Sequence, residues 1–176
     1  MKTQLLPYVH SYPAPVVLIG CGSLDKPNII TCSWFGTVCS EPPMVSVSVR
    51  RNRHSFHLIH ETGEFSANFP RSKDVNLAEY CGTKSGEKVD KFKDLNLTAV
   101  ECPPLKTAPM IQECPLTLAC QVTRELLLGS HYIFIAEIVS VHCDEELARR
   151  DGRADPFPEE QLVYLDKRYW TLRRVT

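Results

Sequence analysis

The sequence lacks the long hydrophobic run that a membrane-spanning helix needs. Apolar stretches such as 16–19 and 126–128 fall far short of the roughly 20 residues that cross a bilayer as a helix. It also lacks an excess of charge of one sign, because 20 basic and 21 acidic residues leave a net charge of -1 at pH 7. Such a balance gives no broad field that would attract nucleic acid or anionic lipid. We therefore expect neither a nucleic-acid partner nor a membrane partner.

Metal-binding and secretion patterns are missing as well. None of the eight cysteines pairs with another as Cys-x-x-Cys, and His57 and His60, one helical turn apart, have no third ligand at a recognisable spacing. Residues 1–9 contain a single Lys and no small-residue cleavage pattern, so they do not resemble a signal peptide. We predict a cytoplasmic protein without a metal site, whose thiols are reduced and pack as small core residues. A redox or metal role for a cysteine is the alternative.

Two catalytic fingerprints are also absent. Gly20-Cys21-Gly22 is followed by Ser-Leu-Asp-Lys-Pro, so the third glycine and the helix of a dinucleotide-binding turn are both missing. No Gly-x-Ser-x-Gly elbow occurs, which leaves acyl transfer without support.

What the sequence does contain is a series of short strand patterns separated by turns. The 44–49 segment alternates Val with Ser, the period of a strand with one buried face, and Gly129-Ser130 separates two apolar runs that can pair as a hairpin. The predicted strands cover residues 16–19, 29–38, 44–49, 116–122, 125–128, 132–139 and 162–165.

Only two helices are predicted with start and stop signals. One covers 53–61, with Asn52 as its cap and Gly63 as its stop, and the other covers 73–80 and ends at Gly82. We expect an ordered loop at 83–94. A chain of 176 residues can form one domain that buries roughly 70% of its unfolded surface. Many strands with few helices favour a mainly β fold, a closed or nearly closed β-barrel with a few short helices against its edges.

Polar residues gather at two places in this pattern. The segment Arg50-Arg51-Asn52-Arg53-His54-Ser55 lies where a strand ends and a helix begins, a position whose free N–H groups favour a bound phosphate. Asn28, Thr31 and Ser33 alternate with apolar residues next to Trp34, an arrangement that suits a flat, partly polar ring. A single ligand with a ring at one end and a phosphate at the other would use both. A solvated basic corner and a strand with one polar face are the alternatives.

Several motifs, taken together and in order, resemble the flavin reductase-like proteins, and flavoredoxins most closely. They are NIITCSWFGTVCSEPPM (28–44), SVSVR (46–50), RHSF (53–56), ETGEF (61–65), CGTKSGEKVDKF (81–92) and GSHYIFIAE (129–137). The likeness covers about residues 10 to 142.

The resemblance implies an FMN-binding split β-barrel that works as a homodimer, formed by one domain over 1–176 with a variable C-terminal extension from about residue 144. Phosphate binding falls to Arg53, His54 and Ser55, while Lys91 reaches into the site. His131 lies near the flavin or the incoming nicotinamide, although Ser130 stands where the family has Asp. The remaining predicted flavin contacts are Asn28, Thr31, Cys32, Ser33, Trp34, Thr37, Ser48 and Val49.

The function implied by the resemblance is an FMN-dependent oxidoreductase that passes electrons from NADH or NADPH to flavin or another acceptor. The alternative is a flavoredoxin-like electron carrier, which relies on a partner protein as donor or acceptor and does not itself turn over nicotinamide. A barrel that binds no flavin and serves as an interaction module is a third possibility, against which the Arg53-His54-Ser55 segment argues.

Overall fold

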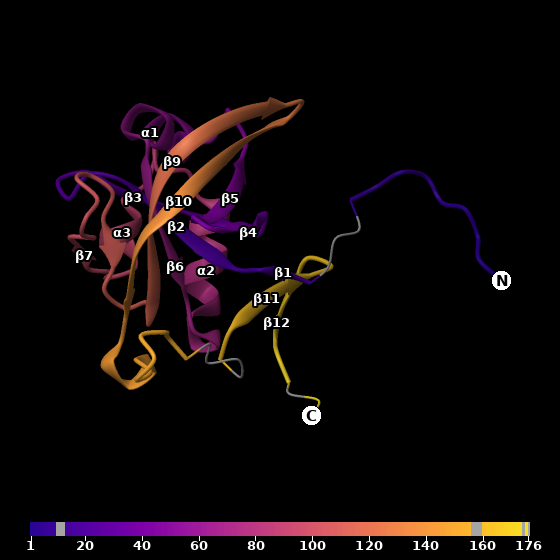
Figure 1. Ribbon diagram of the computed structural model, residues 1–176. Helices are drawn as coiled ribbons and strands as arrows, with labels where there is room; N and C mark the ends of the chain where they lie inside the picture. The colour runs from indigo at the N-terminus through magenta and orange to yellow at the C-terminus, as the bar shows by residue number, and fades with distance from the viewer. Residues whose placement is uncertain (10–12, 156–159, 174, 176) are drawn as a thin grey trace.

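A curled antiparallel sheet of seven strands forms the body of the protein in the computed structural model, which describes residues 1–9, 13–155, 160–173 and 175. Its strand order is β3-β2-β6-β9-β10-β5-β4 (Figure 1). The edge strands β3 and β4 are consecutive in the chain and are separated only by Ser33 and Trp34, so the sheet nearly closes on itself. The strands are β2 (Val17–Gly22), β3 (Pro27–Cys32), β4 (Phe35–Ser40), β5 (Pro43–Val49), β6 (Glu64–Phe69), β9 (Leu116–Leu128) and β10 (His131–Cys143).

Short helices and two small sheets surround this body. The helices are α1 (His54–Thr62), α2 (Val75–Thr83) and α3 (Lys91–Asp94), with 3-10 turns at Ser72–Asp74 and Glu145–Leu147. The small sheets pair β7 (Ala99–Val100) with β8 (Met110–Ile111), and β1 (Ala14–Pro15) with β11 (Leu162–Leu165) and β12 (Arg168–Thr171). The β11–β12 hairpin, yellow in Figure 1, lies beside α2. Within the described ranges, no helix has the length and apolar character to cross a membrane.

Strand β2 is buried on both faces, which explains its continuous apolar pattern. Val17 and Ile19 join one core cluster inside the curled sheet, together with Phe65 and Phe134. Val16 and Leu18, which alternate with them, join a second cluster under α2 and α3 with Ile29, Ala78, Phe92, Ile111 and Leu162. The period-2 alternation of a strand thus divides one sequence run between two cores. The predicted mainly β, nearly closed barrel is confirmed.

Some predicted strand limits are wrong. Gly20 does not end β2 but lies inside it. A glycine is required at this position because a Cβ would collide with Ser66 Oγ and the Pro109 carbonyl oxygen. The run 29–38 is broken by a bend at Ser33 and Trp34, and the 116–122 and 125–128 segments form one strand, β9, with irregular pairing to β10. The predicted 162–165 strand is confirmed.

The helix signals are wrong in three details. The N-cap of α1 is Arg53, without a side-chain cap, rather than Asn52. Gly82 lies within α2, which continues to Thr83. Part of the expected 83–94 loop is the helix α3, whose N-cap Asp90 accepts a hydrogen bond from the backbone N–H of Lys93 at 3.1 Å. The αL stop at Gly63 is confirmed, with φ 68°.

Six of the eight cysteines pack in the core as the sequence predicts, and Cys39 and Cys143 are only partly buried. All eight are free thiols, and Cys21, Cys32, Cys81, Cys102, Cys114 and Cys120 are buried. Burial raises the pKa of Cys81 and of Cys102 to about 11, which keeps both thiols protonated near neutral pH.

Candidate functional site

A cavity of about 220 Å³ opens at the bend between β3 and β4. The end of β5 and the start of α1 form its second side, and Gly82 of α2 forms its third. The backbone N–H of Ser48 donates to the carbonyl oxygen of Trp34 at 2.9 Å, which holds the bend against β5. The lining residues are Ile30, Thr31, Cys32, Ser33, Trp34, Ser48, Val49, Arg50, Arg53, Gly82 and His131.

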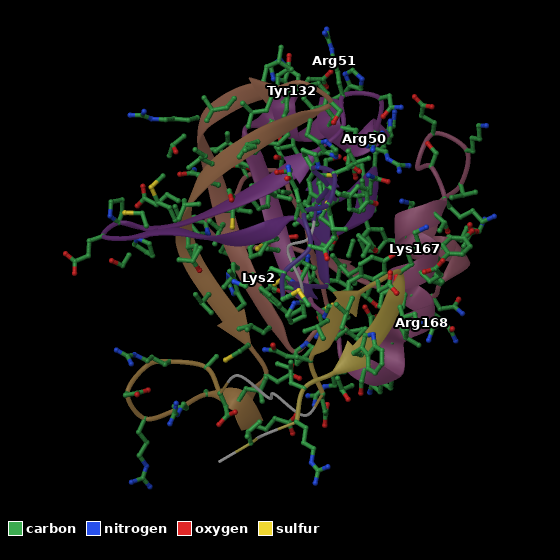
Figure 2. The ribbon with its side chains drawn as sticks, turned by 90° about the vertical axis from the view of Figure 1, so that its right-hand side faces the viewer. Lys2, Arg50, Arg51, Tyr132, Lys167 and Arg168 are labelled. Atoms are coloured by element: carbon green, nitrogen blue, oxygen red, sulfur yellow. The ribbon has the colours of Figure 1, made fainter. Side chains whose placement is uncertain are left out.

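A larger cavity of about 480 Å³ adjoins the first. The two share Thr31, Ser33, Arg50, Arg53 and Gly82, so they form one continuous groove. The far wall of the larger cavity comes from the last part of α2 and from the C-terminal hairpin, through Glu79, Thr83, Tyr164 and Tyr169. Figure 2 shows Arg50 on the same side of the molecule as Lys167 and Arg168 of that hairpin, whereas Arg51 lies at the edge of the view.

Eight of the thirteen predicted site residues line the smaller cavity. They are Thr31, Cys32, Ser33, Trp34, Ser48, Val49, Arg53 and His131. Local structure explains why they converge: Thr31, Ser33 and Trp34 surround the β3–β4 bend, and β10 pairs with β5 next to it, with Tyr132 opposite Val49.

The hydroxyl of Thr31 is already committed as a donor. Its Oγ1 donates to the carbonyl oxygen of Ala78 at 2.6 Å, which ties β3 to α2. The oxygen lone pairs of Thr31 can still accept a hydrogen bond from a ligand. Ser33 lines both cavities as well.

Five predicted residues, Lys91 among them, are not among those that line the two described cavities. Asn28 and Ser55 are 5% and 2% exposed, and Asn28 Nδ2 donates to Ser55 Oγ at 2.7 Å. This pair joins β3 to the first turn of α1 behind the groove. His54 lies near Gly86, and Thr37 is exposed on β4 beyond the bend. Arg53 is therefore the member of the Arg53-His54-Ser55 segment that the fold brings to the groove.

Lys91 is buried and bonded to the backbone. Its Nζ donates to the carbonyl oxygens of Ile29 and Cys81 at 2.5 and 2.9 Å, and its side chain is 3% exposed. Burial lowers the pKa of Lys91, because the charged ammonium loses solvation. These two hydrogen bonds hold β3 and the end of α2 in position, and both elements form the groove.

The groove is electropositive at one end. Within the described chain, no carboxylate lies within ion-pair distance of Arg50 or Arg53, although both line the two cavities. Burial and the nearby charge of Arg50 lower the pKa of His131, which favours the neutral form of its imidazole. Its ring centroid lies 4.5 Å from that of Trp34. Burial raises the pKa of Cys32 to about 12, so this thiol is not a thiolate nucleophile.

Sequence reasoning missed several lining residues. Ile30 and Gly82 belong to the predicted β3 and α2 segments, but nothing in their pattern marks them as facing a cavity. Arg50 was visible in the basic segment but was not assigned to the site. Tyr164 and Tyr169 come from the C-terminal part of the chain, outside the recognised motifs, and only the folded hairpin brings them to the groove.

Comparison with known proteins decides the family. A family model described as "Flavin reductase like domain" matches residues 9–173. The chain belongs to this family. Flavoredoxin from Methanosarcina acetivorans superimposes with a TM-score of 0.90 and 35% identity, over 100% of this chain and 94% of that one. Flavoredoxin of Desulfovibrio vulgaris (Miyazaki F) gives 0.90 and 32%, over 100% and 96%. An uncharacterised protein from Archaeoglobus fulgidus is 36% identical over 147 residues, 83% of this chain and 80% of that protein.

These matches bear on the fold and on the cofactor. Solved split-barrel and FMN-binding proteins share the fold, which confirms the split barrel that the resemblance implied. The residues of this flavin reductase-like chain also suit FMN chemically. Arg53, which has no carboxylate partner among the described residues, offers charge-assisted donors to a phosphate, while Trp34 and Val49 offer apolar contact to a ring.

Proposed function

We propose that the groove binds FMN and that the protein is an oxidoreductase that passes electrons from NADH or NADPH to flavin or another acceptor. One observation carries this proposal: seven predicted flavin contacts and the predicted catalytic residue His131, from motifs far apart in the sequence, converge on one groove. The groove also holds Arg50 and Arg53 without carboxylate partners among the described residues. The nicotinamide step rests on the family and not on a site in this chain.

In this proposal Arg53 binds the phosphate, because it lies at the start of α1 and lines both cavities. Ser33 and Thr31 exchange hydrogen bonds with the polar part of the cofactor, and Trp34 and Val49 contact its ring. When bound, FMN supplies reversible two-electron transfer, while the chain binds and orients it. His131 also lines the groove, where its Nδ1 shares a hydrogen bond with Ser130 Oγ at 2.8 Å.

The predicted residues that line neither cavity have supporting roles in this proposal. They are Asn28, Thr37, His54, Ser55 and Lys91. The Asn28–Ser55 bond and the two Lys91 bonds hold the backbone that carries the groove residues. His54 can contribute through its position in the first helical turn, where N–H groups face outward toward an anion. Thr37 would need a second chain or a shift of β4 to meet the cofactor.

We also propose that the protein is a homodimer and that it works in the cytoplasm. The end of β9 exposes Leu126, Leu127 and Leu128 by 46%, 61% and 56%. An apolar arm of this kind is commonly covered by another chain. Eight free thiols suit a reducing compartment. One domain over 1–176, with an extension from about residue 144, stays a prediction.

One contact favours the flavoredoxin-like carrier as the second candidate. Trp34 lies against His131 at the groove, with 4.5 Å between ring centroids, and the family's Asp is replaced by Ser130. A nicotinamide must stack within about 3.5 Å of the flavin for hydride transfer, so rings at the groove compete for that space. A carrier needs no such opening, because electrons can reach the flavin from a partner protein.

Turnover measurements separate the two candidates. Purified protein loaded with FMN is mixed anaerobically with NADH or NADPH, and bleaching of the flavin absorbance is followed with and without excess free FMN as acceptor. Steady oxidation of either nicotinamide supports the reductase. Stoichiometric reduction by a small electron-transfer protein, with no steady nicotinamide oxidation, supports the carrier. An FMN-loaded protein that neither nicotinamide nor any donor protein reduces would refute both.

A further inference from the structure

The larger cavity of the groove is walled by a part of the chain that lies beyond the motifs of residues 28–137. Tyr164 on β11 and Tyr169 on β12 line it opposite Arg50 and Arg53. Its volume of about 480 Å³ lies within the usual range for small-molecule sites. We call the space between these tyrosines and Arg50 the hairpin chamber.

The tyrosine wall is anchored to the body of the protein. Leu162 is buried in the second core, where Tyr164 and Tyr169 pack against it. The backbone N–H of Val16 donates to the carbonyl oxygen of Leu162 at 3.2 Å, and Ala14 pairs with Tyr164. This hairpin is therefore a fixed side of the groove and not a loose tail.

The same hairpin is also fastened to α2 at the chamber. Tyr169 donates its hydroxyl to Glu79 Oε2 at 3.0 Å, and its ring lies 5.4 Å from that of Tyr164 in an edge-to-face arrangement. Burial and this hydrogen bond raise the pKa of Tyr169, so its hydroxyl stays protonated and committed to Glu79. The aromatic rings are thus held in place while one polar group is already satisfied.

Arg50 is the group in the chamber that favours an anion. The charged residues that line the chamber are Arg50, Arg53 and Glu79, and Glu79 is committed to the Tyr169 hydroxyl. Under the proposed function Arg53 is engaged by the FMN phosphate, so Arg50 is the cation left for a second molecule. An arginine fork pairs well with a carboxylate, sulfonate or phosphate, and ring faces contact a planar aromatic group at little cost in conformational entropy.

We propose that the hairpin chamber is a second ligand site beside the flavin, and that it takes a planar aromatic molecule that carries a negative charge. The proposal rests on the proposed function for the assignment of Arg53 to FMN. The aromatic part lies against Tyr164 and Tyr169, and the anionic group meets Arg50. The C-terminal hairpin then selects which molecule comes close to the flavin.

A calorimetric titration with two matched probes tests this site. The probes are 2-naphthoate and its uncharged counterpart 2-naphthamide, added to FMN-saturated protein. We expect one naphthoate per chain and at least tenfold weaker binding of the amide. Arg50→Gln should remove most of this preference, while Arg51→Gln, a neighbouring exposed residue that does not line the chamber, should leave it unchanged.

A second variant tests the aromatic wall. Tyr164→Leu keeps an apolar side chain packed on the core but removes the ring, and we expect about a tenfold loss of affinity for both probes. The thermal unfolding midpoint and the flavin absorption spectrum of the variant show whether the hairpin and the FMN site are intact.

Two results would overturn the chamber. One is absence of naphthoate binding to protein that holds a full equivalent of FMN. The other is binding to flavin-free protein that FMN competitively displaces, because the space would then belong to the cofactor itself. Both differ from failure of the proposed function, which would appear as absence of FMN binding in a separate flavin titration.

Discussion

Replacement of Arg53 by Ala should weaken FMN binding by about 1.5–3 kcal/mol, the range for a hydrogen bond to a charged group. This corresponds to roughly a 10- to 150-fold increase in the dissociation constant. The argument rests on position, because Arg53 lines both cavities at the start of α1, and no carboxylate among the described residues lies within ion-pair distance of it. Its side chain is exposed, so truncation leaves no buried gap and the barrel should stay folded.

Riboflavin provides the decisive comparison, since it has the same ring but no phosphate. Quenching of flavin fluorescence is titrated with wild-type protein, Arg53→Ala and the control Arg51→Ala. Arg51 is exposed in the same segment but lines neither cavity (Figure 2). We expect Arg53→Ala to weaken FMN binding while riboflavin binding stays within about twofold. An equal loss for both flavins, or no loss for either, would refute the assignment of the phosphate to Arg53.

Three further predictions concern groups around the groove and the core. Glu64 accepts hydrogen bonds from Thr107 N and Oγ1, both at 2.9 Å. Burial alone would raise the pKa of Glu64, but the hydrogen bonds outweigh burial and lower it. A lowered folded pKa gives stability that is present above the unfolded pKa and lost as pH falls through the folded one. Glu64→Gln should therefore lower the free energy of unfolding in urea by about 1–3 kcal/mol at pH 7, with a smaller loss in acid; equal losses at both pH values would contradict this. Lys91→Met removes the donor of two buried backbone carbonyls and should cost about 1–3 kcal/mol in the same assay, so unchanged stability would show that the bonds are dispensable. For His131, proton NMR should give a pKa below 6.5 that rises in Arg50→Gln, since the arginine charge is one cause of its lowering; an unchanged value in the variant would exclude that cause.

The general fold can be predicted from the sequence because the alternation of apolar residues in strands and the residues typical of turns are local signals. The 44–49 alternation and the Gly129-Ser130 turn correspond to β5 and to the β9–β10 hairpin. Strand β6 was missed because it carries buried Ser66 and Asn68, and polar residues weaken a strand pattern. In the fold, Asn68 Nδ2 donates to the Leu18 carbonyl oxygen at 2.9 Å and Asn68 Oδ1 accepts from Thr117 Oγ1 at 2.8 Å. Bonds to residues so far away in the chain cannot be inferred from a local pattern.

The candidate site was also predicted only in part. Motifs found the residues of the β3–β4 bend and Arg53, because a strand end followed by a helix start is visible in the sequence. They could not show that Ser55 faces Asn28 instead of a ligand, since this depends on how α1 packs on β3. The contribution of Tyr164 and Tyr169 depends on a hairpin folded back onto α2, a long-range contact without a sequence signature.

The most direct test of the central claim is a visible absorption titration of flavin-stripped protein with FMN. The account predicts shifted flavin bands, quenched fluorescence and saturation near one FMN per chain. Absence of saturable binding by correctly folded protein would contradict it, because the converging residues of the groove would then have no flavin to hold.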